Sequence, residues 1–105
     1  MPRAAIPLLA AALIVALPAK LAAARSPPDP TTVRLFTTSC GWCHEDGGRR
    51  ESVRGPRLAG TFRSDAYIID LVRFGKPGAM PAFGDTLSPG QIQALLRYIR
   101  SLNSG

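Results

Sequence analysis

The chain has 105 residues, 13 of them basic and 7 acidic, and its formal net charge is +6. A chain of this length forms one domain at most. Its two cysteines and one histidine are too few for the four-ligand site that structural zinc usually takes. No basic helix with interleaved aromatic residues is present, which argues against a nucleic-acid partner.

The first residues are typical of a secretory signal peptide. A short basic start, Met1-Pro2-Arg3, precedes an unbroken apolar run over residues 8–17, and Ala22-Ala23-Ala24 fits a cleavage site. The alternative is an uncut membrane anchor, but the apolar run falls well short of the ~20 residues that a spanning helix needs. We therefore expect residues 1–24 to be removed on export to the periplasm. The domain would then comprise residues 25–105, with no stable membrane insertion.

The exported part begins with a proline-rich lead-in and a helix. Three prolines make residues 25–30 extended. The helix should start near Asp29 or Thr31, because proline is tolerated in a first turn. Val33, Phe36 and Cys40 recur at spacings of three and four, so they share one helix face.

This helix leads into the run Cys40-Gly41-Trp42-Cys43-His44, a C-x-x-C-H pattern. The pattern is the attachment signature of a c-type haem, in which each thiol forms a thioether to a vinyl group and the histidine binds the iron. A C-x-x-C pair can instead be a thiol–disulfide redox motif or half of a zinc site. The redox motif would lie near a βαβ pattern, which this chain lacks. The run therefore predicts one haem c, attached through Cys40 and Cys43, with His44 as an iron ligand.

One loop and one helix should follow the motif. Residues 45–55 contain paired glycines and no apolar periodicity, so we expect a loop there. Ser64 has the character of an N-cap, and the helix that it starts should end at Gly75. The apolar stripe expected on this helix consists of Tyr67, Ile68, Leu71 and Val72.

The last helix has the strongest start signal in the chain. Ser88-Pro89-Gly90-Gln91 supplies an N-cap, a proline at the first helical position and a capping-box glutamine. The positions expected to face inward are Ile92, Leu95, Leu96, Ile99 and Leu102, with Gln93, Arg97 and Arg100 outward. No strand is predicted, so the fold class is all-α.

Residues 76–84 are rich in proline and glycine and can form neither a helix nor a central strand. This loop carries Met80, the one methionine left after removal of the signal peptide. We predict that its thioether fills the sixth iron position, with an amine such as Lys76 or an open position as alternatives. Ligation by His44 and Met80 raises the reduction potential and leaves no coordination site for oxygen or substrate. This ligand pair favours electron transfer over catalysis, so we do not expect an enzyme.

Together these motifs resemble those of short bacterial class I cytochromes c over nearly all of residues 33–102. The resemblance rests on Leu35-Phe36 ahead of Cys40, the G-P-x-L-x-G turn of residues 55–60 and the M-P-A-F-G loop of residues 80–84. It implies a small cytochrome c fold, with three to four helices wrapped around one covalently attached haem and with the N- and C-terminal helices crossing.

The resemblance also implies where those two helices meet. Leu95 and Tyr98 of the last helix would cross the first helix at Phe36. The family commonly has glycine four residues before this aromatic residue, whereas this chain has Thr32. The two helices are therefore expected to lie slightly further apart than usual.

Further site roles follow from the same resemblance. The carbonyl of Pro56 would accept the second ring hydrogen of His44, fixing its tautomer. Leu58, Tyr67 and Phe83 would line the haem pocket, together with Ile68 and Leu71. The family's longer members bind a propionate through a tryptophan that has no counterpart here, so Arg57, Arg63 and Tyr67 are the candidate propionate partners.

Five arginines surround the loop after the haem motif, at positions 49, 50, 54, 57 and 63. They form either a solvated face or a docking patch for an acidic redox partner. Trp42, between the two cysteines, is expected at the surface.

The sequence as a whole predicts a soluble, monomeric, periplasmic electron carrier with one haem. It would shuttle single electrons from a dehydrogenase or respiratory donor to an oxidase or another cytochrome. One alternative is a five-coordinate haem enzyme or gas sensor in which Met80 is unbound. Another is a haem subunit of a larger oxidoreductase complex.

Overall fold

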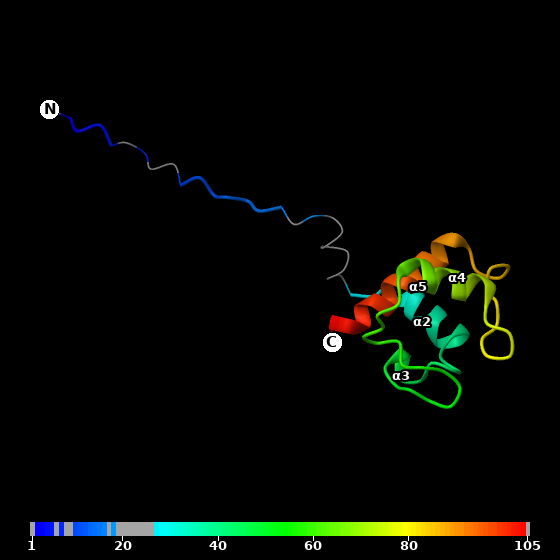
Figure 1. Ribbon diagram of the computed structural model, residues 1–105. Coiled ribbons are helices and arrows are strands. Elements are labelled where there is room, and N and C mark those ends of the chain that lie inside the picture. Colours follow the sequence, from blue (N-terminus) through cyan, green and yellow to red (C-terminus); the bar gives the residue numbers. More distant parts are fainter. Residues whose placement is uncertain (1, 6, 8–9, 17, 19–26, 105) are drawn as a thin grey trace.

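The computed structural model describes residues 2–5, 7, 10–16, 18 and 27–104. Within these residues there are four α-helices, a short 3-10 helix and no strand, so the all-α prediction is confirmed for the described part (Figure 1). The elements are α2 (Pro30–Ser39), α3 (Glu45–Gly48), α4 (Asp65–Phe74), α5 (Pro89–Ser101) and η1 (Leu102–Ser104).

The described residues before position 27 have no regular secondary structure. The expected cleavage site at Ala24 and the start of the lead-in, residues 25–26, lie outside the described residues. The signal peptide and the domain boundary at residue 25 therefore stay predictions. Among the helices of the described segments, none has the length and apolar character to cross a membrane.

Helix α2 begins where the sequence predicts. Asp29 is its N-cap and accepts hydrogen bonds from both the backbone N–H and the hydroxyl of Thr32, each at 3.2 Å. Pro30 occupies the first turn, where backbone N–H groups have no acceptor within the helix, so the lack of an N–H in proline costs no hydrogen bond. The helix ends at Cys40, whose N–H donates to the Phe36 carbonyl at 2.8 Å.

Helix α5 carries the predicted capping box: the Ser88 hydroxyl accepts from the N–H of Gln91, and the Gln91 side chain accepts from the N–H of Ser88. It crosses α2 at the predicted point, with the rings of Phe36 and Tyr98 4.6 Å apart between centroids. Phe36 and Leu95 are the most completely buried large side chains among the described residues. The same buried cluster includes Ile92, Leu96 and Ile99 of α5 and Leu102 of η1. The crossing of α2 and α5 therefore lies at the centre of the hydrophobic core.

Helix α4 packs against α5 through Ile68 and Val72, which are buried as predicted. Leu71 is half-buried, and Tyr67 is 44% exposed. Tyr67 is thus less buried than its place in the predicted stripe suggests. The guanidinium of Arg63 lies over its ring, 4.7 Å from the centroid.

Arg100 does not point into solvent as the helix pattern predicts. Its Nε and Nη2 atoms donate to Asp65 Oδ1 at 3.0 and 2.7 Å, and it also donates to the carbonyls of Thr61 at 3.2 Å and Arg63 at 2.6 Å. The prediction was wrong because these acceptors lie 35 to 39 residues away in the chain and come beside α5 only in the folded protein. Arg100 therefore fixes the N-terminal end of α4 against α5.

The expected loop over residues 45–55 was wrong at its start, where α3 forms a single turn. This turn is irregular, since Asp46 and Gly47 both have positive φ angles of 52° and 64°. The buried Tyr98 of α5 secures it by donating its hydroxyl to the Gly47 carbonyl at 2.7 Å. Four residues are too few to show apolar periodicity, so no helix is predicted here from the residues alone.

Candidate functional site

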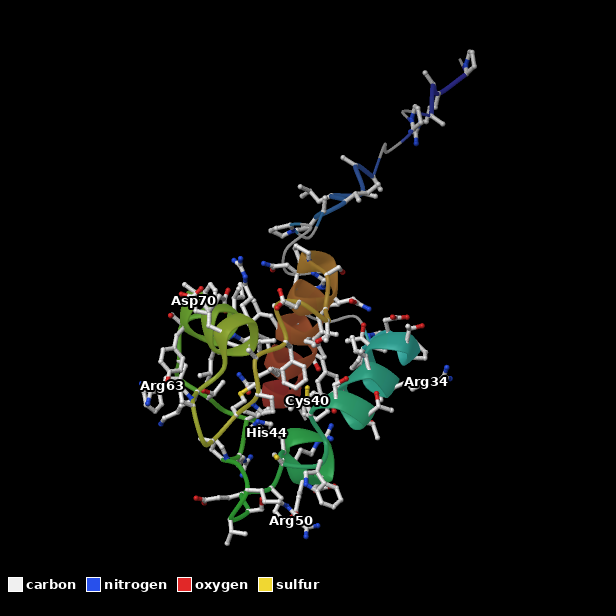
Figure 2. The ribbon with its side chains drawn as sticks, turned by 90° about the vertical axis from the view of Figure 1, so that its right-hand side faces the viewer. Arg34, Cys40, His44, Arg50, Arg63 and Asp70 are labelled. Carbon is white, nitrogen blue, oxygen red and sulfur yellow. The ribbon has the colours of Figure 1, made fainter. Side chains whose placement is uncertain are left out.

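The C-x-x-C-H run forms a tight turn at the end of α2. The N–H of Gly41 donates to the Phe36 carbonyl at 2.9 Å, and the N–H of His44 donates to the Cys40 carbonyl at 2.9 Å. A Cβ atom at Gly41 would lie 2.6 Å from the carbonyl oxygen of Thr37, so a side chain there would require the end of α2 to shift. Figure 2 shows the outcome, with Cys40 and His44 near the centre of the molecule and Arg50 and Arg63 at its edge.

The two cysteines are free thiols, and both are half-buried. Burial, with a smaller contribution from Cys43, raises the pKa of the Cys40 thiol to about 11. Thiol–disulfide enzymes need the opposite shift, because the thiolate is the attacking species and a low pKa provides it. The environment of Cys40 therefore disfavours the redox-motif alternative. The described residues also contain no cluster of three or more His, Cys, Asp or Glu side chains able to hold a metal ion.

His44 is buried, and its Nδ1 atom lies 3.1 Å from the carbonyl oxygen of Pro56. A carbonyl oxygen only accepts hydrogen bonds, so Nδ1 must carry the proton. In a neutral imidazole the lone pair then belongs to Nε2, which is the atom available to bind a metal. The structure thus contains the hydrogen bond that the resemblance implied, and it prepares His44 for use as a ligand.

A tight turn over residues 52–55 supports the imidazole from the side. The Ser52 hydroxyl donates to the Cys43 carbonyl at 3.2 Å, and Ser52 and Gly55 pair their backbones. A Cβ atom at Gly55 would lie 2.8 Å from the Cys43 carbonyl oxygen and 3.1 Å from two ring atoms of His44. The absence of a side chain at Gly55 therefore lets the turn lie directly against the histidine ring.

Met80 lies in a loop that α4 holds at both ends. The N–H groups of Phe83 and Gly84 donate to the carbonyls of Val72 and Arg73 at 2.8 and 3.0 Å. These carbonyls belong to the last turn of α4, where helical partners are missing. The Met80 side chain is half-buried and packs against the hydrophobic core.

The other predicted site residues divide into two groups. Leu58 and Phe83 are half-buried and, like Met80, pack against the hydrophobic core. Tyr67 is more exposed and stacks with Arg63, whose guanidinium also lies 5.1 Å from the ring centroid of Phe62. The roles of these residues in lining a haem pocket stay predictions.

The donor set of the chain fits a covalently bound haem. It comprises two free thiols, an imidazole with its Nε2 lone pair available, and a thioether on a separately anchored loop. Cys40 and Met80 pack against the same hydrophobic core as half-buried apolar side chains such as Leu58 and Phe83, which suits a large apolar ring.

Four of the five arginines after the motif have partners within the protein, Arg49 among them through a side-chain hydrogen bond with Tyr98. Arg54 pairs with Glu45 at 2.9 Å and lies over the exposed Trp42 ring, 4.7 Å from its centroid. Arg57 Nε donates to the Ala59 carbonyl at 3.1 Å, and Arg63 stacks as described above. These contacts were not predicted, because the sequence does not show which acidic or aromatic residue each arginine reaches. Because these arginines already have partners within the protein, the contacts favour the solvated face over a docking patch of unpaired positive charges.

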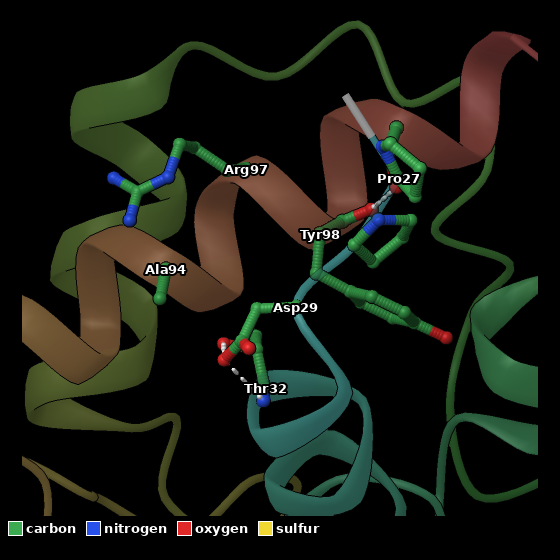
Figure 3. A pocket seen from close by; sticks show the side chains of 8 residues that line it. Pro27, Asp29, Thr32, Ala94, Arg97 and Tyr98 are labelled. Carbon is green, nitrogen blue, oxygen red and sulfur yellow. Dashed lines mark hydrogen bonds between the residues drawn. The ribbon is translucent and has the colours of Figure 1, made fainter. Parts of the chain in front are cut away.

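A cavity of about 240 Å³ lies away from these residues, between α2, α5 and the proline-rich lead-in (Figure 3). Pro27, Asp29, Thr32, Ala94, Arg97 and Tyr98 line it. None of the predicted site residues borders this cavity.

A family model described as cytochrome c oxidase, cbb3-type, subunit III matches residues 29–99. The matched region contains α2, the C-x-x-C-H run, α4, the Met80 loop and most of α5. The chain belongs to this family. The domain is thus a class I-like monohaem cytochrome c, which confirms the resemblance. Membership implies haem c with its iron as the cofactor and electron transport as the process.

Three relatives carry the name cbb3-type cytochrome c oxidase subunit FixP. The chain is 32% identical to that of Bradyrhizobium diazoefficiens over 77 residues, which are 69% of this chain and 27% of the relative. It is 32% identical to that of Azorhizobium caulinodans over 78 residues, 68% of this chain and 26% of the relative. It is 30% identical to that of Bradyrhizobium sp. over 77 residues, 69% of this chain and 27% of the relative.

The chain therefore spans about a quarter of the length of these FixP proteins. No solved structure matches it significantly. The names of the relatives favour the alternative of a haem subunit in a larger oxidoreductase complex over that of an independent soluble carrier.

Proposed function

We propose that the chain is the haem-carrying, electron-transferring module of a cbb3-type oxidase or a similar oxidoreductase complex. The observation that carries the proposal is the hydrogen bond from His44 Nδ1 to the Pro56 carbonyl, directly after two free thiols. It leaves Nε2 as the ligand atom on the only histidine of the chain. Family membership and the names of the relatives support the choice of a complex as partner.

Each residue of the site has a separate task in this proposal. The thiols of Cys40 and Cys43 would hold the ring through thioethers, and His44 Nε2 and the Met80 sulfur would bind its iron. When bound, the haem supplies a centre that gains and loses one electron at a time. Pro56 holds His44 in the required tautomer throughout, because its carbonyl keeps the proton on Nδ1.

The surroundings of the site would raise the reduction potential. A thioether ligand favours ferrous iron, and the apolar side chains of Leu58 and Phe83 keep water away from the more highly charged oxidised state. With His44 and Met80 both bound to the iron, no coordination site would remain for a substrate. We therefore propose that the module passes electrons to a partner and is not itself a catalyst.

Export belongs to the same proposal. Residues 1–24 have the composition of a signal peptide, and haem attachment to a C-x-x-C-H motif would then take place in the periplasm. The observations that support an independent periplasmic shuttle support a subunit of a complex equally well. Only the names of the relatives distinguish the two, and they favour the subunit.

Haem attachment is tested by producing the chain together with a c-type haem maturation system. We expect one haem per chain that stays bound after denaturation, and we expect it to be lost when Cys40 and Cys43 are both replaced by alanine. Haem that dissociates from the denatured wild-type chain would contradict covalent attachment.

Ligation is tested with Met80→Ala, using Pro77→Ala in the same loop as control. The wild-type ferrous protein and the Pro77 variant should not bind carbon monoxide, whereas Met80→Ala should bind it readily, since the sixth position is then open. Carbon monoxide binding by the wild-type protein would instead favour the sensor or enzyme alternative.

Partnership is tested by purifying the tagged full chain from its own organism. Oxidase subunits should co-purify with it in mild detergent, in fixed proportion to haem c. A tagged chain that elutes alone as a monomer would contradict the complex and support the free carrier.

A further inference from the structure

The end of α4 and the Met80 loop touch at one residue, Gly75. Gly75 caps α4, and its N–H donates to the Leu71 carbonyl at 2.8 Å. A Cβ atom built there would lie 2.7 Å from both the Met80 carbonyl oxygen and the Ala82 N–H nitrogen, and 2.8 Å from the Pro81 carbonyl carbon. All three are backbone atoms, so no side-chain rotation could relieve the contact. The backbone around Met80 therefore lies directly on the Cα atom of Gly75.

The loop cannot easily move away from this contact. The N–H of Lys76 donates to the Met80 carbonyl at 2.9 Å, and the N–H of Met80 donates to the Lys76 carbonyl at 2.8 Å. On the far side, Phe83 and Gly84 are hydrogen-bonded to the last turn of α4. A side chain at Gly75 would thus push on a segment whose two ends are fixed, and the displacement would fall on residues 80–82.

Gly84, on the loop, makes a similar close backbone contact with the last turn of α4. Its Cβ atom would lie 2.8 Å from the carbonyl oxygen of Arg73. Two glycines, one on α4 and one on the loop, therefore allow the helix end and the loop to approach within backbone contact.

A simpler explanation is that Gly75 serves only to end the helix, since its φ angle of 71° favours glycine in any case. Gly78 separates the two explanations. It has a similar φ angle of 74°, lies three residues further along, and has no atom within 4 Å of its Cβ position. Substitution of Gly78 brings the strain of a positive φ angle without the contact, whereas Gly75 also has a ψ angle of −175° that restricts it further to glycine.

We propose that Gly75 is the positioning residue for the Met80 thioether, and that its missing side chain sets where the sulfur lies. This inference rests on the proposed function, because it takes Met80 to be an iron ligand. A displacement of residues 80–82 would move the sulfur without changing any ligand, thiol or haem-attachment residue.

The test compares haem-loaded wild-type protein with Gly75→Ala, Gly84→Ala, Gly78→Ala and Met80→Ala. The readouts are the sulfur-to-iron charge-transfer absorbance of the ferric protein and carbon monoxide binding by the ferrous protein. We expect Gly75→Ala to lose this absorbance and to bind carbon monoxide, as Met80→Ala does, while its covalent haem content stays at the wild-type level. Gly78→Ala should keep the wild-type spectrum.

The outcomes separate this inference from the proposed function. If Met80→Ala changes the spectrum and Gly75→Ala does not, the positioning role of Gly75 is overturned while the ligand assignment stands. If Gly78→Ala loses the absorbance as well, backbone strain explains the effect and the inference is again overturned. If Met80→Ala itself changes nothing, the ligand assignment fails and the inference with it. Should Gly75→Ala not fold, loss of the absorbance in Gly84→Ala supports the contact, and retention of it overturns the inference.

Discussion

Replacing Tyr98 by phenylalanine removes one hydroxyl from the centre of the fold and leaves the packing in place. The ring keeps its contact with Phe36, whose centroid lies 4.6 Å away. What is lost is the hydrogen bond that the hydroxyl donates to the Gly47 carbonyl at 2.7 Å, together with its side-chain hydrogen bond with Arg49. This bond joins α5 to the irregular turn that follows His44, residues 45–48.

The size of the effect follows mainly from the bond to the partly buried Gly47 carbonyl. A neutral hydrogen bond contributes about 1 kcal/mol net to the free energy of unfolding, and a partly buried acceptor left without a donor adds to the cost. We therefore expect a loss of about 1–2 kcal/mol. For a domain of this size, each kcal/mol lowers the melting temperature by about 4–8 °C.

The same residue gives the stability a pH dependence. Burial is the main cause that raises the pKa of the Tyr98 hydroxyl above its ordinary value of 10.0, although Arg49 acts in the opposite direction. Below pH 10.0 the phenol is neutral in both the folded and the unfolded protein, so its full contribution to the free energy of unfolding is present. Above it the unfolded chain ionises first, so the free energy of unfolding falls as pH rises towards the folded pKa. The phenylalanine variant should lack this part of the alkaline loss.

The assay is urea unfolding of the haem-loaded protein, followed by far-UV circular dichroism at neutral pH and again above pH 10. The variant should unfold at a lower urea concentration at neutral pH, and the difference from wild type should shrink in alkali. An unchanged midpoint at neutral pH would refute the reasoning, because it would mean that water replaces the hydroxyl at the Gly47 carbonyl without cost.

Two other predictions concern local geometry. Gly55→Ala should lower the free energy of unfolding by about 1–3 kcal/mol and shift the reduction potential, because its Cβ atom would meet the Cys43 carbonyl and the His44 ring. Gly90→Ala is its control in the same urea and redox titrations, and should be neutral or stabilising, since it lies in α5 with no atom closer than 3.9 Å. Ser88→Ala should cost about 1 kcal/mol in urea unfolding, because it removes the N-cap of α5, and an unchanged midpoint would show that the cap is replaced by solvent.

Much of the site was available from the sequence because it is local. Ser64 and Ser88 cap their helices as predicted, and α2 starts where expected with Asp29 as its cap, since each cap bonds to an N–H only three residues away. The C-x-x-C-H run is likewise a set of neighbours whose spacing alone carries the chemistry. The crossing of α2 and α5 came from the resemblance and not from the residues themselves.

The sequence by itself thus determined the helix starts, the all-α class and the groups able to hold a haem. Only the tertiary structure decided that Arg100 turns back to Asp65, that Gly55 lies on the His44 ring and that Gly75 lies under the Met80 backbone. The physical reason is range. A cap or a spacing involves residues three or four positions apart in one regular element, whereas these contacts depend on how turns and loops fold back onto the helices beside them.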